Sequence, residues 1–218
     1  MSDTEWVGRH DLAGFLPAPT PDDDKYSRGV VGLAVGSEDY PGAAVLAAEA
    51  AVCAGAGLVR VIAPRRVCDI VLARRPEVVC VGGRVDSLVV GSGMVDGATT
   101  DVAGRVASCD LAEDGVVIVD AGALAETPQL PGHRILTPHA GEVRRLAELL
   151  DLPGQSPDTW AEALADRWGV IVVLKGHRPT VYSPDGLVDQ LPAGTPWLAS
   201  AGTGDVLAGL MGAMAALT

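Results

Sequence analysis

The chain has 218 residues, of which 48% are hydrophobic and 4% aromatic, with 27 glycines and 15 prolines. This length favours a single domain whose core consists of small aliphatic side chains around tight turns. Because 16 lysines and arginines stand against 28 aspartates and glutamates, the net charge of −12 argues against nucleic acid or an anionic membrane as a partner.

Residues 1–27 lack sustained periodicity, and Pro17, Pro19 and Pro21 are followed by three consecutive aspartates. We therefore expect an N-terminal arm over residues 1–27 and one domain over residues 28–218. The N-terminus is acidic where a signal peptide is basic, and no uncharged apolar run reaches the roughly 18 residues of a membrane span. These features predict a cytoplasmic protein.

From residue 30 onward the pattern predicts alternating strands and helices. Val30–Val35 is an apolar run of strand length, and the alanine-rich segment Ala43–Ala54 behind Pro41 is typical of a helix. Further strands are expected at 58–62, 87–90, 116–119, 134–136 and 170–174, further helices at 67–74, 99–108, 142–150, 158–168 and 204–217, and a hairpin of 181–182 with 187–188. This order predicts an α/β fold with a mainly parallel central sheet and helices on both faces. In such folds ligands bind beyond the carboxyl ends of the strands.

The signatures of several common sites are missing. The sequence contains no GxxxxGK[ST] phosphate loop, and neither Gly55-Ala56-Gly57 nor Gly91-Ser92-Gly93 continues with the glycine spacing of a dinucleotide fingerprint. Gly91-Ser92-Gly93 follows a strand, where it is either a simple turn or a place for close ligand approach. The four cysteines form no CxxC pair, so we expect neither a disulfide framework nor a zinc site. They are Cys53, Cys68, Cys80 and Cys109.

The segment Gly202-Thr203-Gly204-Asp205 opens the last predicted helix. Glycines let successive N–H groups point toward one position, and a helix N-terminus adds a partial positive charge, so Gly202, Thr203 and Gly204 are candidates for an anion hole. Asp205 then either accepts a proton from a substrate hydroxyl or only caps the helix. Both interpretations remain open from this segment alone.

Polar residues also follow three other predicted strands. Lys175-Gly176-His177-Arg178 either holds nucleotide phosphates or forms a solvated turn. In Thr137-Pro138-His139-Ala140-Gly141-Glu142, we expect Thr137 to cap a helix and Glu142 to bind its first amides, while His139 either reaches into the crevice or is structural. Asp120 follows the strand at 116–119 and either binds a metal-bound phosphate or fixes a loop. These side chains converge on one edge of the sheet, which predicts a site there.

Short motifs spread along the chain form a recognisable set. They are Lys25-Tyr26-Ser27-Arg28-Gly29, Gly36-Ser37 with Tyr40-Pro41-Gly42-Ala43-Ala44, Ala54-Gly55-Ala56-Gly57-Leu58-Val59, Leu136-Thr137-Pro138-His139 with Gly141-Glu142, Val173-Leu174-Lys175-Gly176, and Ala201-Gly202-Thr203-Gly204-Asp205-Val206-Leu207-Ala208-Gly209. In this order they resemble the ADP-dependent NAD(P)H-hydrate dehydratases of the ribokinase-like superfamily. The resemblance extends from about Lys25 to the end of the chain.

The resemblance implies a repair enzyme for the 6S hydrate of NADH or NADPH. ADP, or else ATP, would drive dehydration, and ADP would yield AMP and phosphate, with Mg²⁺ accompanying the phosphates. Asp205 would be the catalytic base. The adenine nucleotide would be held by Lys175, Gly176, His177, Arg178, Pro179 and Gly204, and the hydrate by Ala43, Gly93, His139 and Asp205. No metal ligand is identified.

The chain also departs from the family pattern. Met94-Val95 replaces a further glycine, Gly122 stands where the family usually has a second acid, and Arg178-Pro179 lengthens the Lys175 loop. We expect a short dehydratase domain without an epimerase domain, which implies a separate NAD(P)H-hydrate epimerase, and we expect a homo-oligomer. Two alternatives stay open: a small-molecule kinase of the same superfamily and a nucleotide-binding relative without catalysis.

Overall fold

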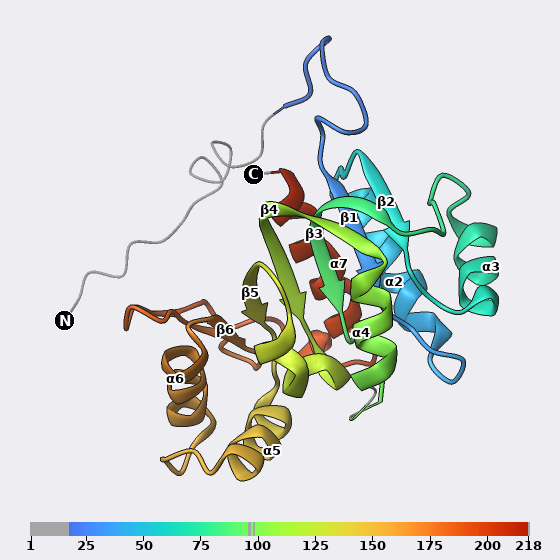
Figure 1. Ribbon diagram of the computed structural model, residues 1–218. Helices are drawn as coiled ribbons and strands as arrows, with labels where there is room; N and C mark the ends of the chain where they lie inside the picture. The colour runs from blue at the N-terminus through green and yellow to red at the C-terminus, as the bar shows by residue number, and fades with distance from the viewer. Residues whose placement is uncertain (1–17, 96, 98, 218) are drawn as a thin grey trace.

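The computed structural model describes residues 18–95, 97 and 99–217, and it contains an eight-stranded sheet in the order β2-β1-β3-β4-β5-β6-β7-β8 (Figure 1). Neighbouring strands from β2 to β6 are parallel, and β6, β7 and β8 pair antiparallel. The predicted mainly parallel sheet and its hairpin are therefore confirmed. The strands are β1 (Val30–Ala34), β2 (Leu58–Val61), β3 (Gly83–Val90), β4 (Cys109–Val119), β5 (His133–Leu136), β6 (Ile171–Leu174), β7 (Thr180–Tyr182) and β8 (Val188–Gln190).

Helices cover both faces of the sheet and bury two separate apolar cores, as expected. Because side chains alternate along a strand, Val117 and Val119 of β4 enter one core while Ile118 enters the other. The first core is covered by α4 (Thr99–Ala107), α5 (Ala140–Leu150), α6 (Pro157–Trp168) and the 3₁₀ segment η1 (Ala121–Gln129); the second by α2 (Pro41–Cys53), α3 (Arg65–Arg74) and α7 (Thr203–Leu217).

Helix α7 lies unusually close to its neighbours because glycines face them. A Cβ atom added at Gly209 would lie 2.3 Å from the Ala47 carbonyl oxygen of α2, and one at Gly212 would lie 2.5 Å from Val89 of β3. The Ser87 hydroxyl donates a hydrogen bond of 2.6 Å to the Gly212 carbonyl. The sheet and α2 together therefore fix the helix whose first turn carries Asp205.

Two strands begin earlier than the apolar runs predicted. β3 starts at Gly83 rather than Ser87, and β4 at Cys109 rather than Val116. Charged residues interrupt the first paired part of these strands, for example Arg84 opposite Asp110, so this part lacks the continuous apolar run used to predict a strand. The 3₁₀ segment η1 was also not predicted, since its residues show no regular apolar period.

The N-terminal arm is seen only from Ala18 onward, and the rest of its predicted range lies outside the described residues. Residues 18–27 are exposed and contain turns such as the one closed by Asp24, whose carboxylate accepts from the amides of Tyr26 and Ser27. Across the described part of the chain, none of the helices combines the length and apolar character required to cross a membrane.

Candidate active site

The turns after four parallel strands and the start of α7 meet at one edge of the sheet, which we call the carboxyl edge. Gly93 follows β3, Asp120 follows β4, His139 follows β5 and Lys175 follows β6. The first turn of α7 adds Gly204 and Asp205, and an added Cβ at Gly204 would lie 3.6 Å from the Lys175 ammonium. The structure thus brings the residues singled out in the sequence into one neighbourhood.

Asp120 is the centre of this neighbourhood. Its side chain is buried, and its Oδ2 accepts a hydrogen bond of 2.9 Å from the Ser92 hydroxyl. Its Oδ1 accepts 2.9 Å from the Thr137 hydroxyl and 2.6 Å from the Lys175 ammonium. One carboxylate therefore ties together the ends of β3, β4, β5 and β6. The sequence offered a loop-fixing role for Asp120, but it gave no sign that Ser92 takes part.

Lys175 turns inward while the rest of its loop faces solvent. Its Nζ lies 3.7 Å from Glu142 Oε2 as well as 2.6 Å from Asp120 Oδ1. Gly176, His177 and Arg178 are exposed, and Pro179 is half-buried. Within the described residues, the side chains of His177 and Arg178 make no hydrogen bond or ion pair with the protein. The predicted cationic cluster therefore divides into one paired ammonium and two solvent-facing groups.

His139, not Thr137, caps α5. The His139 backbone is extended, and its Nδ1 accepts hydrogen bonds from the amides of Gly141 (3.0 Å) and Glu142 (3.2 Å). Glu142 Oε2 in turn accepts 2.6 Å from the His139 amide, as the sequence predicted for Glu142. The prediction that Thr137 caps this helix is wrong, because its hydroxyl donates instead to Asp120 and to the Val119 carbonyl.

The capping geometry also fixes the tautomer of His139. An Nδ1 that accepts amide hydrogens carries none of its own, so the ring hydrogen is on Nε2. That nitrogen lies 3.5 Å from Glu142 Oε1, and 53% of the His139 side chain is exposed. Half of the ring thus remains accessible from the carboxyl edge.

Asp205 stands on the first turn of α7, where the opening backbone amides have no acceptor within the helix. Thr203 uses its hydroxyl locally, donating to the carbonyls of Leu198 (3.0 Å) and Ser200 (2.8 Å). No described residue donates a hydrogen bond to the Asp205 carboxylate, which does not support the alternative that Asp205 only caps the helix.

The surroundings of Asp205 make it a better proton acceptor. Partial burial raises the pKa of its carboxyl above the ordinary value, the negative charge of Asp120 raises it further, and Lys175 offsets part of the rise. A carboxylate that is half-buried, unpaired and more basic than usual is suited to removing a proton from a bound hydroxyl.

Gly93 and Ala43 lie in contact at the same edge. A Cβ atom added at Gly93, where φ is +68°, would lie 2.4 Å from the Ala43 Cβ and 3.1 Å from the Gly36 Cα. The adjoining Ser92 carbonyl accepts 2.7 Å from the Gly36 amide. Gly91-Ser92-Gly93 is therefore a tight turn. Its glycines also leave room for a ligand to approach the backbone, so both the simple turn and the ligand-approach interpretation remain open.

Two departures from the family pattern contact each other. A Cβ atom added at Gly122 would lie 2.5 Å from the Met94 carbonyl oxygen and 2.7 Å from that of Val95. In this conformation the segment after Gly93 fills the space that a side chain at position 122 needs. The glycine at 122 and the Met94-Val95 segment are thus explained together.

The carboxyl edge offers no ready cage for a metal ion. The described residues contain no group of three or more His, Cys, Asp or Glu side chains able to hold one. Both Asp120 oxygens already accept hydrogen bonds, and Glu142 is engaged in the α5 cap. These residues do not fit a protein-bound Mg²⁺, although Mg²⁺ commonly binds chiefly to substrate phosphates and water.

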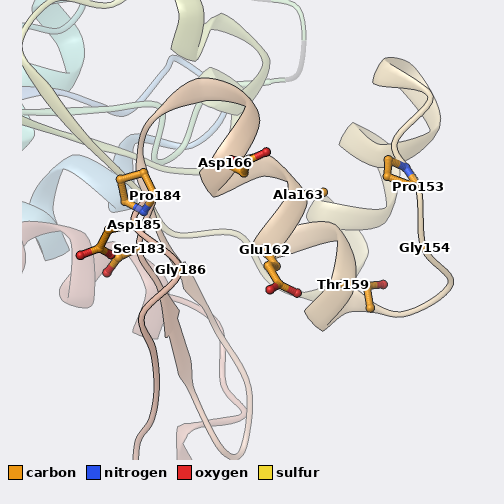
Figure 2. Close-up of a pocket in the computed structure, with 10 residues that line it drawn as sticks. All are labelled: Pro153, Gly154, Thr159, Glu162, Ala163, Asp166, Ser183, Pro184, Asp185 and Gly186. Carbon is orange, nitrogen blue, oxygen red and sulfur yellow. The ribbon is translucent and has the colours of Figure 1, made fainter.

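Two open depressions lie at the opposite edge of the sheet, which we call the amino edge. One, of about 570 Å³, lies between α6 and the β7–β8 turn, where Figure 2 shows Glu162, Asp166 and Asp185. The other, of about 510 Å³, is lined by the beginnings of β5 and β6 and by the same turn. Neither contains a residue that the sequence singled out for chemistry.

Comparison with known sequences gives a consistent family. A family model described as NAD(P)H-hydrate dehydratase matches residues 31–218. The Bifunctional NAD(P)H-hydrate repair enzyme Nnr of Mycobacterium tuberculosis is 43% identical over 219 residues, which cover 94% of this chain and 45% of that protein. The ADP-dependent (S)-NAD(P)H-hydrate dehydratase of Xanthomonas campestris is 34% identical, covering 92% of this chain and 76% of that one. The chain thus spans less than half of its bifunctional relative.

Solved structures agree with this fold. The ADP/ATP-dependent NAD(P)H-hydrate dehydratase of Bacillus subtilis, co-crystallised with ATP/Mg²⁺, superposes with a TM-score of 0.80 at 26% identity, covering 99% of this chain and 83% of that one. The adenosine kinase of Trypanosoma brucei brucei superposes with a TM-score of 0.59 at 14% identity, covering 93% of this chain and 89% of that one. The latter similarity concerns the fold alone. The ribokinase-like architecture is confirmed by a ribokinase-like superfamily protein of Enterococcus faecalis, which superposes with a TM-score of 0.77 at 28% identity, covering 93% of this chain and 76% of that one.

Proposed function

The chain belongs to the NAD(P)H-hydrate dehydratase family, and from this premise we propose that residues 28–218 act as one catalytic domain that dehydrates the 6S hydrate of NADH or NADPH. ADP is the proposed co-substrate, in keeping with the name of the X. campestris relative, and ATP is the alternative that the B. subtilis co-crystal supports. Residues 1–27 would be an arm outside this domain.

In the proposed reaction the substrate hydroxyl first becomes a leaving group. Asp205 removes the proton from the hydroxyl on the hydrated ring carbon, whose oxygen attacks the β-phosphorus of ADP. The bond from that phosphorus to AMP breaks, giving AMP and a phosphate ester. The ring nitrogen then expels inorganic phosphate, and loss of a proton from the neighbouring carbon restores the double bond. The products are NAD(P)H, AMP, phosphate and a proton.

The placement of Asp205 is the observation that carries this proposal. Its carboxylate is unpaired within the described residues and more basic than usual, and it stands on the turn whose free amides can hold a phosphoryl group. Lys175 lies beside Gly204 with its ammonium directed to the same turn. A base and an anion site at one helix start are what phosphoryl transfer to a substrate hydroxyl requires.

We assign the residues that bind the nucleotide and the hydrate by their positions along the carboxyl edge. The nucleotide would lie over Lys175, Gly176, His177, Arg178, Pro179 and Gly204, with Gly202, Thr203 and Gly204 as the anion hole. The hydrate would lie toward Ala43, Gly93 and the exposed half of His139. Mg²⁺ would enter with the nucleotide and neutralise phosphate charge, and we assign it no protein ligand.

The test is to incubate the protein with 6S hydrated NADH and either ADP or ATP while following the absorbance of reduced nicotinamide. We expect recovery of the absorbance with at least one nucleotide. A kinase would instead accumulate a stable phosphorylated product without recovery, and a non-catalytic relative would bind the nucleotide with neither outcome. Absence of recovery with both nucleotides contradicts the proposal.

Two partner predictions accompany this function. Epimerisation of the 6R hydrate would fall to a separate NAD(P)H-hydrate epimerase outside residues 28–218, a suggestion supported by the bifunctional relatives. Self-association is supported by exposed leucine and valine side chains on the outer sides of α2 and α7: Leu46 (37% exposed), Val206 (41%) and Leu210 (39%). Light scattering during gel filtration tests it, and a monomer at all concentrations contradicts it.

A further inference from the structure

Three carboxylates compete for one ammonium at the carboxyl edge. Lys175 Nζ is 2.6 Å from Asp120 and 3.7 Å from Glu142, and it forms no ion pair within 4.0 Å with Asp205. We propose that Asp120 is a positioning residue: it holds Lys175 at the start of α7, presents it to the nucleotide, and keeps it from neutralising Asp205. This inference rests on the proposed function for the roles of the nucleotide and of Asp205.

Asp120 is held more firmly than its partner. Only 3% of the residue is exposed, and hydroxyl donors on two other strand ends fix both carboxylate oxygens. A Cβ atom added at Gly91 would lie only 1.9 Å from the backbone carbonyl oxygen of Asp120, so the turns after β3 and β4 are in close contact. The residue that follows, Ala121, adopts the left-handed conformation with φ +44°, which is uncommon for alanine and occurs where surrounding contacts impose it.

The lysine depends on this anchor because little else holds its ammonium. Its backbone amide donates 2.8 Å to the Pro138 carbonyl, which fixes the main chain but leaves a four-carbon side chain to be placed. Of the three donors on an ammonium, Asp120 uses one and Glu142 is beyond hydrogen-bond distance. Two donors thus remain for a phosphate bound at the α7 amides, beside Gly204.

Removing the charge of Asp120 should let the Lys175 ammonium pair with another carboxylate. The groups facing the ammonium would then be Glu142, which also binds the His139 amide, and Asp205 across the gap at Gly204. Asp205 is the carboxylate without a protein hydrogen bond in the described structure, so it is the freest to take the ammonium. Loss of the Asp120 charge and approach of Lys175 both favour the ionised form of Asp205.

The first experiment uses the fact that the chain has two lysines, Lys25 and Lys175. Limiting acylation of the full-length protein, read by peptide mass spectrometry, gives the reactivity of Lys175 relative to exposed Lys25. In Asp120→Asn we expect this ratio to rise severalfold, because the ammonium loses its 2.6 Å hydrogen bond to the buried carboxylate and moves toward the start of α7, where the reagent reaches it more easily. Glu148→Gln removes an equal charge from the exposed side of α5 and should leave the ratio unchanged.

An unchanged ratio in folded Asp120→Asn overturns the proposal, and this readout needs no catalytic activity. Circular dichroism checks the fold of each variant. If Asp120→Asn does not fold, Thr137→Val removes one donor to the same oxygen while keeping the charge of Asp120, and we expect the ratio to fall about twofold because that oxygen then binds the ammonium more strongly. An unchanged ratio in folded Thr137→Val then overturns it equally.

The second experiment measures the pH profile of dehydration. In Asp120→Asn we expect the KM for ADP to rise and the acidic limb of kcat/KM to move to lower pH, because Asp205 becomes less basic without the charge of Asp120. A purely structural defect lowers kcat/KM at every pH without moving the limb, and that outcome overturns the role of Asp120 toward Asp205. Failure of the proposed function is distinct: the wild-type protein would then show no dehydration, while the lysine ratio would still respond.

Discussion

The two edges of the sheet are formed by the same strands, but polar side chains are paired and buried at one edge and exposed at the other. At the carboxyl edge, Asp120 and Lys175 are drawn inward and paired at 2.6 Å. At the amino edge, Glu162 and Asp166 remain exposed around an open depression, and the buried Nε of Arg134 has no hydrogen-bond partner among the described residues. The two depressions are therefore at one edge and the organised chemistry at the other.

The direction of the chain explains this difference. Each parallel strand from β3 to β6 ends at the carboxyl edge. Helix α4 follows β3, η1 follows β4 and α5 follows β5, and α7 also begins at this edge, so free amides of helix starts collect there. The amino edge receives helix ends, whose carbonyls do not attract anions. In this fold the ends of the parallel strands are therefore a better guide to the candidate site than the presence of a depression.

The largest expected effect is that of Asp205→Asn. We expect kcat to fall at least about a hundredfold, the contribution of a positioned general base, while the Kd for ADP stays within about threefold. Stopped absorbance assays and calorimetric titration measure the two quantities. Asp114→Asn, an exposed change near the amino edge, is the matched control, and unchanged turnover in Asp205→Asn would remove this residue from the mechanism.

The next effect is that of Lys175→Ala on nucleotide binding. Loss of a charge-assisted hydrogen bond should raise the Kd for ADP about tenfold or more and change hydrate affinity much less. Titrations in an Asp205→Asn background avoid turnover, and Lys25→Ala controls for loss of a lysine charge. Equal weakening of both ligands would make Lys175 a structural residue.

A smaller effect tests how tightly the carboxyl edge is packed. Gly122→Ala places a methyl group against the Met94 carbonyl and should lower the free energy of unfolding by about 1–3 kcal/mol. Gly104→Ala adds the same methyl group to α4, where nothing lies within 4 Å. This change should raise the free energy of unfolding by about 0.5–1 kcal/mol. Urea denaturation measures both, and equal values for the two variants would contradict the close contact at position 122.

The smallest effect belongs to the amino edge. Glu162→Gln combined with Asp166→Asn removes two exposed charges, and we expect kcat and the KM values to stay within about twofold. Steady-state kinetics with both substrates provides the measurement. A tenfold loss of kcat/KM would show that the amino edge takes part in function, and the contrast between the edges would then fail.

Much of the fold could be predicted because it depends on local patterns. Val30–Val35 and Ala43–Ala54 show strand and helix character in their own residues, and the structure contains both elements with ends shifted by one or two positions. The early parts of β3 and β4 could not be predicted, because their pairing depends on neighbouring strands rather than on an apolar run.

The location of the candidate site could be predicted from the sequence, but the hydrogen bonds between its residues could not. Strand ends indicated Asp120, His139 and Lys175, since parallel strands carry their following turns to one edge. The choice of His139 over Thr137 as the α5 cap could not be predicted, because the Thr137 hydroxyl is taken by Asp120, seventeen residues earlier in the chain. Ser92 was missed for the same reason: only the folded sheet brings it to Asp120.

Because α7 packs closely through its glycines, the proposed activity should depend on positions that carry no side chain and lie away from the substrate. Gly209 lies one helical turn, about 6 Å, beyond Asp205, and it touches α2 rather than any ligand site. A methyl group there would push α7 away from Ala47, displacing the proposed base Asp205 and the amides proposed to bind phosphate, while Asp120 and Lys175 stay with their strands. Random mutagenesis scored for lost activity should therefore yield hits at Gly209, a position that no inspection of substrate contacts would select.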